Sequence, residues 1–359
     1  MSDSMTLRWT VGLAITVVLL AIAARRLVFL VALVRSGTPA PGRTANRSER
    51  AATQATEVLG QRKLLAWTIP GIAHVFAFWG FLVLSLTILE AFGALFDSEF
   101  AVPIIGRWPA IGFIEDLFAV LVLVGIAMFS IIRLQKNPAK LGRDSRFFGS
   151  HTGAAWLVLF MIANVIWTLL LYRGAQYNVS LEKGTNNFPF MNGGAFASEL
   201  VAGWLHPLGV TANEWLETIG LWLNIGVILG FLVFVLNSKH LHIGAAPLNI
   251  LFSRRPDALG PLLPMYAGSD EVNFEDPQDN ALFGRGQIED FTWKGNLDLL
   301  SCTECGRCQS QCPAWNTGKP LSPKLMVMDL RDHLFAKAPY VLAAEAARAN
   351  HAGPESERP

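Results

Sequence analysis

The chain has 359 residues, of which 52% are hydrophobic and 16% are charged, and its formal net charge at pH 7 is +1. Soluble domains contain about 25% charged residues, so this composition argues against an ordinary soluble globule and against a disordered chain. The near-neutral charge offers no broad basic surface, and no nucleic-acid partner is expected. All four cysteines lie between Cys302 and Cys312, which is too crowded for a disulfide scaffold and indicates a metal centre.

Five apolar segments are each long enough, at roughly 20 residues, to cross a lipid bilayer as a helix. They cover residues 10–34, 64–92, 113–134, 154–172 and 217–236, and we expect the last one to continue to Ile243. A short interfacial helix is predicted over residues 195–206, in the long loop before the fifth span. After Ile243 the chain becomes polar and rich in proline. The sequence therefore predicts an all-α membrane protein with a five-helix transmembrane bundle, followed by a water-exposed domain.

Lysine and arginine are distributed unevenly among the loops that join these segments. The loops after the first and third spans are basic, and the loops on the opposite side carry few positive charges. The residues concerned are Arg43, Arg47, Arg50, Arg62 and Lys63 in the first loop and Arg133, Lys136, Lys140, Arg143 and Arg146 in the third. Because basic loops stay in the cytoplasm, we expect a multi-pass protein of the cell (inner or plasma) membrane. Its N-terminus would lie outside and its C-terminal domain in the cytoplasm.

The cysteines form one run, Cys302-Thr-Glu-Cys305-Gly-Arg-Cys308-Gln-Ser-Gln-Cys312-Pro313. This is C-x2-C-x2-C-x3-C-P, the spacing of a bacterial [4Fe-4S] ligand run. Structural zinc sites use separated cysteine pairs or histidines, and they fit a single run poorly. In proteins with two such runs the fourth cysteine binds the other cluster. Cys312 therefore either shares the cluster of the other three cysteines or serves a second cluster.

A second cluster would need a further iron–sulfur subunit or a missing C-terminal domain, and we expect the chain to be the N-terminal part of a longer one. The predicted domains are the five-span transmembrane bundle over residues 1–243 and a linker over 244–280. A small, mainly helical [4Fe-4S] ferredoxin-like domain follows over 281–350, with a disordered tail over 351–359.

Histidines in or next to the apolar segments are the second group of candidates. His74 lies in the second span, and an ionisable residue inside the membrane is a functional candidate; its alternative role is a hydrogen-bonded packing residue. His240 and His242 close the fifth span on the same side. Two axial imidazoles from facing helices of a bundle can bind haem b. Residues two apart on an α-helix point about 200° from each other, so only one of His240 and His242 should face the bundle interior.

Two stretches resemble known families. His74 and the sequence Ser238-Lys-His-Leu-His-Ile243 together resemble the nitrate reductase gamma-subunit type of membrane cytochrome b. This resemblance implies that His74 and His242, rather than His240, hold one haem b near the cytoplasmic side. The positions that would bind the family's second haem are Leu84 and Asn224 in this chain, so a single haem is expected.

The cysteine run with its flanks, Phe291-Thr-Trp-Lys before it and residues 313–323 after it, resembles the iron–sulfur subunit of heterodisulfide reductase. The fusion of both parts resembles the membrane-bound electron transfer flavoprotein:menaquinone reductases. It implies a quinone-linked oxidoreductase embedded in membrane lipid. Electrons would pass from a soluble cytoplasmic donor, an electron transfer flavoprotein linked to fatty-acid β-oxidation, through the [4Fe-4S] cluster and haem b to menaquinone.

Two other functions remain open at this point. The chain could be a non-catalytic membrane anchor or assembly subunit of an iron–sulfur oxidoreductase complex. A transporter is disfavoured, because intramembrane charge is sparse and no broken-helix pair recurs in two halves. Quinone reduction takes up two protons, and four ionisable residues toward the outer face are candidates for supplying them, with interfacial solvation and helix capping as their alternative roles. These residues are Glu90, Glu115, Asp116 and His206.

Overall fold

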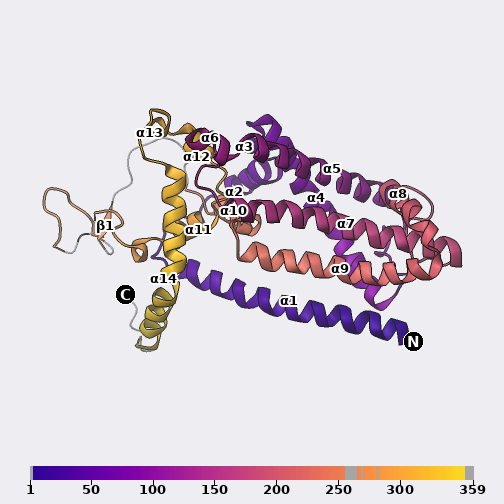
Figure 1. The fold of residues 1–359 in the computed structure, drawn as a ribbon. Helices are drawn as coiled ribbons and strands as arrows, with labels where there is room; N and C mark the ends of the chain where they lie inside the picture. The colour runs from indigo at the N-terminus through magenta and orange to yellow at the C-terminus, as the bar shows by residue number, and fades with distance from the viewer. Residues whose placement is uncertain (1–2, 255–264, 268–269, 280, 282, 352–359) are drawn as a thin grey trace. The chain divides into compact units, whose positions relative to one another are not determined.

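The computed structural model describes residues 3–254, 265–267, 270–279, 281 and 283–351 of the chain. It divides into two compact units, each built from segments that are far apart in the sequence (Figure 1). The first, here the bundle unit, comprises Met1–Arg26, Gln61–Ser145 and His151–Ser238. The second, here the cysteine unit, comprises Leu27–Gly60, Arg146–Ser150 and Lys239–Pro359.

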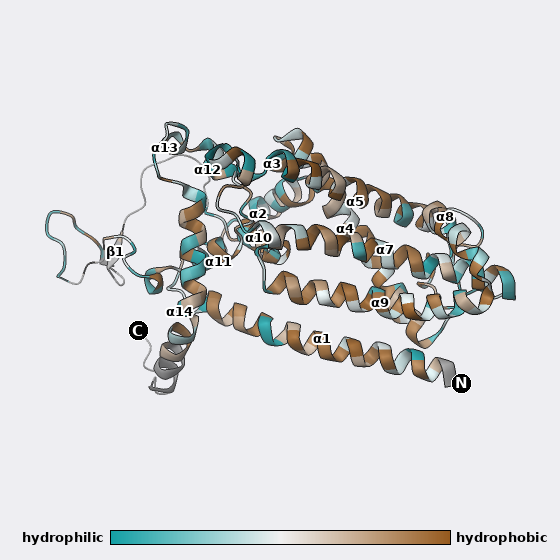
Figure 2. Ribbon diagram, in the orientation of Figure 1, coloured by the Kyte–Doolittle hydropathy of each residue, from teal (hydrophilic) through white to brown (hydrophobic). Residues whose placement is uncertain are grey.

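Five helices in the described part of the chain are long and apolar enough to cross a membrane. They are α1 (Asp3–Arg35), α4 (Thr68–Phe96), α5 (Pro109–Gln135), α7 (Thr152–Lys183) and α9 (Val210–Leu236). Figure 2 shows that apolar residues cover most of their length. The predicted mainly helical protein with five membrane-length helices is therefore confirmed, and the chain is a membrane protein.

The remaining elements of the bundle unit are short. They are α3 (Arg62–Leu65), α6 (Pro138–Leu141), η2 (Gly142–Asp144), α8 (Phe196–Leu205) and η3 (His206–Leu208). The helix predicted over residues 195–206 is thus present as α8, and a 3-10 turn containing Pro207 follows it. The core between α4, α5, α7 and α9 consists mostly of aliphatic side chains, which include Ala91, Ala119, Leu169, Leu221 and Ile225.

The C-terminal ends of α7 and α9 differ clearly from the sequence-based prediction. Helix α7 continues beyond Tyr172 to Lys183, because the polar residues of its last turns, among them Arg173 and Asn178, are buried against protein. Helix α9 ends at Leu236, so the predicted continuation of this span to Ile243 is wrong. The chain instead turns at Asn237 and enters a short 3-10 turn, η4 (Lys239–Leu241).

The cysteine unit is built from short helices around one long helix. Its elements are α2 (Arg47–Thr53), η1 (Gln54–Leu59), η4, α10 (His242–Leu251), β1 (Tyr266–Ala267), β2 (Asp270–Glu271), η5 (Ile288–Asp290), α11 (Trp293–Leu300), α12 (Arg307–Gln311), α13 (Pro313–Asn316) and α14 (Pro323–His351). Strands β1 and β2 pair antiparallel, with Tyr266 opposite Glu271. The last turns of α1 belong to this unit, since Leu33 packs in one core with Ile288, Leu299 and Leu334.

Three predicted boundaries fall on parts of this unit. The range predicted as a linker, 244–280, includes most of α10 and the β1–β2 pair, whereas residues 255–264, 268–269 and 280 lie outside the described part. Apart from His351, the last residue of α14, the tail predicted over 351–359 also lies outside it. The ferredoxin-like character of residues 281–350 stays a prediction.

Candidate metal centre

The four cysteines lie on one short stretch, residues 302–312, here the cysteine segment. Cys302 follows the end of α11, Cys308 lies in α12, and Cys312 separates α12 from α13. Cys302 and Cys312 are half-buried, Cys305 and Cys308 are exposed, and all four are free of disulfides. The segment therefore presents four thiols that are chemically available as metal ligands.

A left-handed backbone shapes the turn between the second and third cysteines. Gly306 has φ 75°, and a Cβ atom built on it would lie 2.1 Å from the carbonyl oxygen of Arg146. Only glycine satisfies both conditions without strain or collision. Glu304 is also left-handed, with φ 57°, although it carries a side chain, so neighbouring contacts must offset the strain of this conformation.

The chemistry of the donors fits an iron–sulfur cluster. Thiolates are the protein ligands of such clusters, and nearby cations favour the thiolate form. The guanidinium of Arg146 lies next to the segment, where its Nε donates a hydrogen bond to the carbonyl oxygen of Cys305 at 2.9 Å. Among the described residues, no group of three or more His, Cys, Asp or Glu side chains is arranged to hold a metal ion. The sulfur atoms are thus on one segment but are not gathered around a common centre.

Burial and charge shift the pKa values of three groups around the segment. Burial raises the pKa of the Cys302 thiol, so this group must release a proton when it binds iron. Burial lowers the pKa of Lys324 to about 8, although the charges of Glu304 and Cys308 act in the opposite direction. Burial also acts to lower the pKa of Arg331, but the hydrogen bond and charge of Glu304 outweigh it, and the pKa is raised.

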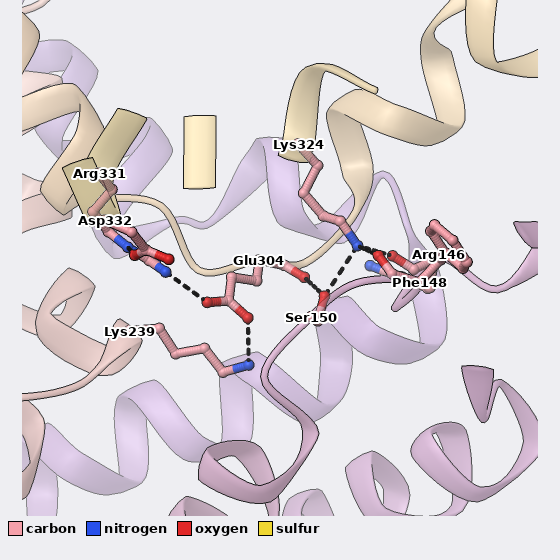
Figure 3. A network of polar contacts seen from close by, with 8 residues as sticks. All are labelled: Arg146, Phe148, Ser150, Lys239, Glu304, Lys324, Arg331 and Asp332. Atoms are coloured by element: carbon pink, nitrogen blue, oxygen red, sulfur yellow. Dashed lines mark hydrogen bonds and ion pairs between the residues drawn. The ribbon is translucent and has the colours of Figure 1, made fainter. Parts of the chain in front are cut away.

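A loop from a distant part of the sequence, Arg146–Ser150, supports the cysteine segment (Figure 3). The hydroxyl of Ser150 donates to the carbonyl oxygen of Glu304 at 3.1 Å. Lys324, which is 1% exposed, donates from Nζ to the carbonyl oxygens of Arg146 and Phe148 and to Ser150 Oγ. The lysine from α14 thereby holds this loop in the conformation that contacts the cysteine segment.

The side chain of Glu304 is buried and points toward Lys239 and Arg331 (Figure 3). Its Oε2 accepts a hydrogen bond from Lys239 Nζ, and its Oε1 accepts one from Arg331 Nη2, both at 2.9 Å. No sequence motif links these three residues. The available signal is a carboxylate between two candidate ligand cysteines, but its two partners are too distant in sequence to be identified from a motif.

His74 lies in α4 of the bundle unit and is half-buried. Its Nδ1 is 2.8 Å from the side-chain oxygen Oε1 of Gln61, which is itself buried. With the proton on Nδ1, this atom donates to Gln61 and leaves Nε2 as the basic nitrogen. Histidines that bind metals are commonly oriented by such a hydrogen bond through the other ring nitrogen.

His240 and His242 belong to the cysteine unit, as does the cysteine segment. His240 lies in η4 and His242 begins α10, and their ring centroids are 5.7 Å apart with 58° between the ring planes. The expectation that they point in nearly opposite directions is therefore wrong. It assumed a continuous α-helix, whereas the helix ends at Leu236 and a tighter turn follows.

Three of the four candidates for supplying protons lie around Arg173, a residue that no sequence pattern marked as their partner. The Arg173 guanidinium lies 3.0 Å from Glu115, 3.8 Å from Asp116 and 4.0 Å from Glu90. Asp116 also accepts hydrogen bonds from the backbone N–H and the hydroxyl of Ser198. His206 does not join this cluster. It is 3.4 Å from Glu182, and more than half of its side chain is exposed.

Several curated proteins share sequence with this chain. The "Probable iron-sulfur-binding oxidoreductase FadF" of Bacillus subtilis is 34% identical over 289 residues, which are 78% of this chain and 36% of that protein. The "EtfAB:quinone oxidoreductase" of Syntrophomonas wolfei is 29% identical over 301 residues, 80% of this chain and 38% of that protein. The "Probable membrane-anchored ferredoxin" of Chromohalobacter salexigens is 32% identical over 145 residues, 37% of this chain and 21% of that protein.

The chain thus spans less than two fifths of the length of these relatives. No protein-family model and no solved structure matches it. The relatives confirm the predicted kinship with membrane-associated iron–sulfur oxidoreductases of electron transfer. Their names do not bear on the predicted cytochrome b part.

Proposed function

We propose that this chain is the membrane-bound part of a quinone-linked oxidoreductase. It would transfer electrons from a soluble cytoplasmic donor protein to menaquinone, with a [4Fe-4S] cluster and one haem b as its cofactors. The observation that carries this proposal is the composition of the cysteine unit, which contains both the C-x2-C-x2-C-x3-C-P segment and the His240–His242 pair. The name of the Syntrophomonas wolfei relative supports quinone as the acceptor and an electron transfer flavoprotein as the donor.

The residues that would hold the cofactors are those predicted from the sequence. Cys302, Cys305 and Cys308 would bind the cluster, and Cys312 would complete it or serve a second one held by a further iron–sulfur subunit or domain. His74 and His242 would bind the haem, and the ring of His240 lies next to that of His242. When bound, both cofactors supply one-electron chemistry that protein side chains lack.

The surrounding residues would adjust these sites. Arg146 and Lys324 place positive charge beside the cysteine segment, which favours bound thiolates and influences the reduction potential. Gln61 would keep the ring of His74 oriented through its Nδ1 atom. The distribution of basic loops supports an N-terminus outside the cell membrane and a cysteine unit in the cytoplasm.

The test is a cofactor analysis of the full-length protein purified from membranes. We expect iron and acid-labile sulfide, and a reducible b-type Soret and α-band. C305S should lower iron and sulfide, and H74A or H242A should remove the haem bands. H206A serves as the control, because His206 lies at the surface beside Glu182. A protein that contains neither iron nor sulfide would refute the proposal.

A second candidate is a non-catalytic membrane anchor or assembly subunit for an iron–sulfur complex. The name of the Chromohalobacter salexigens relative, a membrane-anchored ferredoxin, favours it. In this case His74 is a packing residue, and its hydrogen bond to Gln61 serves that role equally well. Unchanged haem content and unchanged quinone-linked activity in H74A and H242A would favour the anchor over the oxidoreductase.

A further inference from the structure

Glu304 lies between two candidate cluster ligands, yet its side chain is among the most deeply buried charged groups of the cysteine unit. It is 2% exposed, while the adjacent Cys305 is exposed. Its backbone is held in the left-handed region at φ 57°. The carboxylate thus lies inside the protein, whereas the neighbouring thiol lies at the surface. A residue that merely spaced two cysteines would not need a buried charge.

Both oxygens of this carboxylate have cationic partners (Figure 3). Lys239 contributes one and Arg331 the other, each at 2.9 Å, and the side chains of all three residues are more than nine-tenths buried. A buried charge is tolerated when it is paired and hydrogen-bonded, and removing one partner leaves the others uncompensated. The three side chains therefore act as one unit, and the central member is the carboxylate.

The two cations come from different elements. Arg331 lies on α14, the long helix of the cysteine unit. Lys239 is the first residue of η4 and directly precedes His240, and His242 follows at the start of α10. The ion pair between Lys239 and Glu304 thus joins the cysteine segment to the turn that carries both histidines, residues 239–242, here the histidine turn.

The backbone of the cysteine segment has its own attachments beside this ion pair. Ser150 donates to the carbonyl oxygen of Glu304, and Arg146 donates to that of Cys305. These two bonds attach the segment to the Arg146–Ser150 loop and need no carboxylate. The carboxylate instead attaches the segment to the histidine turn. Replacing the carboxylate therefore removes this attachment and leaves the two backbone hydrogen bonds in place.

We propose that Glu304 is a positioning residue that fixes the cysteine segment relative to the histidine turn. Through Lys239 it would hold the candidate cluster ligands and the candidate haem ligands at a constant separation. The inference rests on the proposed function, because it takes the cysteines as cluster ligands and His240 or His242 as a haem ligand. Sites that must keep a set geometry need such support from neighbouring side chains.

The experiment uses the full-length protein with its cofactors and compares E304Q, K239M and the double variant. The control is E289Q, which removes the carboxylate of an exposed ion pair with Lys337 in the same unit. The measurements are the line width and midpoint potential of the cluster in electron paramagnetic resonance, the haem spectrum, and the rate of iron loss to a chelator. Side chains that support a metal ligand typically contribute 10- to 100-fold to binding, so we expect E304Q to lose iron roughly 10- to 100-fold faster.

The decisive variant is K239M, because it changes no residue of the cysteine segment. If Glu304 positions the two segments, K239M broadens the cluster signal and E304Q alters the haem spectrum. The effect of the double variant on the rate of iron loss is then smaller than the sum of the effects of the two single variants. An ion pair that only stabilises the fold would lower the unfolding temperature and leave both signals unchanged, and this result would overturn the inference.

Two outcomes keep the inference separate from the proposed function. If E304Q fails to assemble a cluster, the test depends on the cluster signal of K239M alone, and a broadened signal would support the inference. If the wild-type protein contains a cluster but lacks haem, the haem part of the proposed function fails, and a response of the cluster to K239M would still support the link between the two segments. A cluster unaffected by K239M would overturn the link in either case.

Discussion

Gly306 and Arg146 meet so closely that a Cβ atom on the glycine would lie 2.1 Å from the carbonyl oxygen of the arginine. The two residues come from parts of the chain separated by two membrane-length helices, α7 and α9. The contact therefore places the turn of the cysteine segment directly on the Arg146–Ser150 loop. A backbone oxygen cannot move aside as a flexible side chain can, so the approach depends on the absence of a side chain at position 306.

We predict that G306A prevents the cysteine segment from forming its turn. The left-handed backbone alone costs a non-glycine residue about 1–3 kcal/mol, and the collision with Arg146 adds to it. Iron content per chain and thermal unfolding in detergent should both fall. G318A is the matched control, because Gly318 is also left-handed, with φ 83°, but has open space where the Cβ would lie. Equal effects of both variants would show that the close approach is unimportant.

A second prediction concerns Lys324, whose ammonium group donates to three oxygens of the Arg146–Ser150 loop. K324M retains an unbranched side chain of similar size but removes these hydrogen bonds, and loss of a partner from a buried polar group costs about 1–3 kcal/mol. We expect the loop to loosen, which should be visible as faster tryptic cleavage after Arg146 by mass spectrometry. K337M is the control on the same helix, since Lys337 forms an exposed ion pair of small energetic value. Similar cleavage rates in the two variants would contradict the role of Lys324.

The sequence predicts those features of the structure that depend on residues close together in the chain. It does not predict contacts between distant parts of the chain. Apolar length is a local property, and it predicted all five membrane-length helices. The cysteine spacing is local too, and it located the candidate ligands. The end of α9 was missed because the chain turns at Asn237 and enters η4 without a proline or glycine in residues 237–243 to mark the break. The partners of Glu304 and Arg173 were missed because they come from other helices, and pairing across a fold leaves no periodic signal in the chain.

Arg173 provides a third prediction, because it is the cation around which Glu90, Glu115 and Asp116 gather inside the bundle unit. R173M would leave three buried carboxylates without their shared guanidinium. Breaking a buried charge pair by removing one partner costs about 3–5 kcal/mol, so we expect a large drop in the unfolding temperature and in membrane yield. K183M is the control on the same helix, since Lys183 pairs with Glu214 at the surface, where such pairs contribute about 0–1 kcal/mol. A stable R173M protein would mean that this cluster does not support the bundle.

The last prediction concerns Gln61, whose side-chain oxygen lies 2.8 Å from Nδ1 of His74. If His74 binds haem through Nε2, the hydrogen bond to Gln61 orients the ring without touching the iron. Q61A should then retain haem but hold it roughly 10- to 100-fold more weakly, the range for partners of metal-binding histidines, whereas H74A should lose it. Haem titration followed by the α-band distinguishes the two variants. Q54A is the control, because Gln54 donates to the carbonyl oxygen of Pro247 in the cysteine unit and should leave the titration unchanged. Wild-type haem affinity in Q61A would indicate that the hydrogen bond serves packing and that His74 is oriented by other contacts.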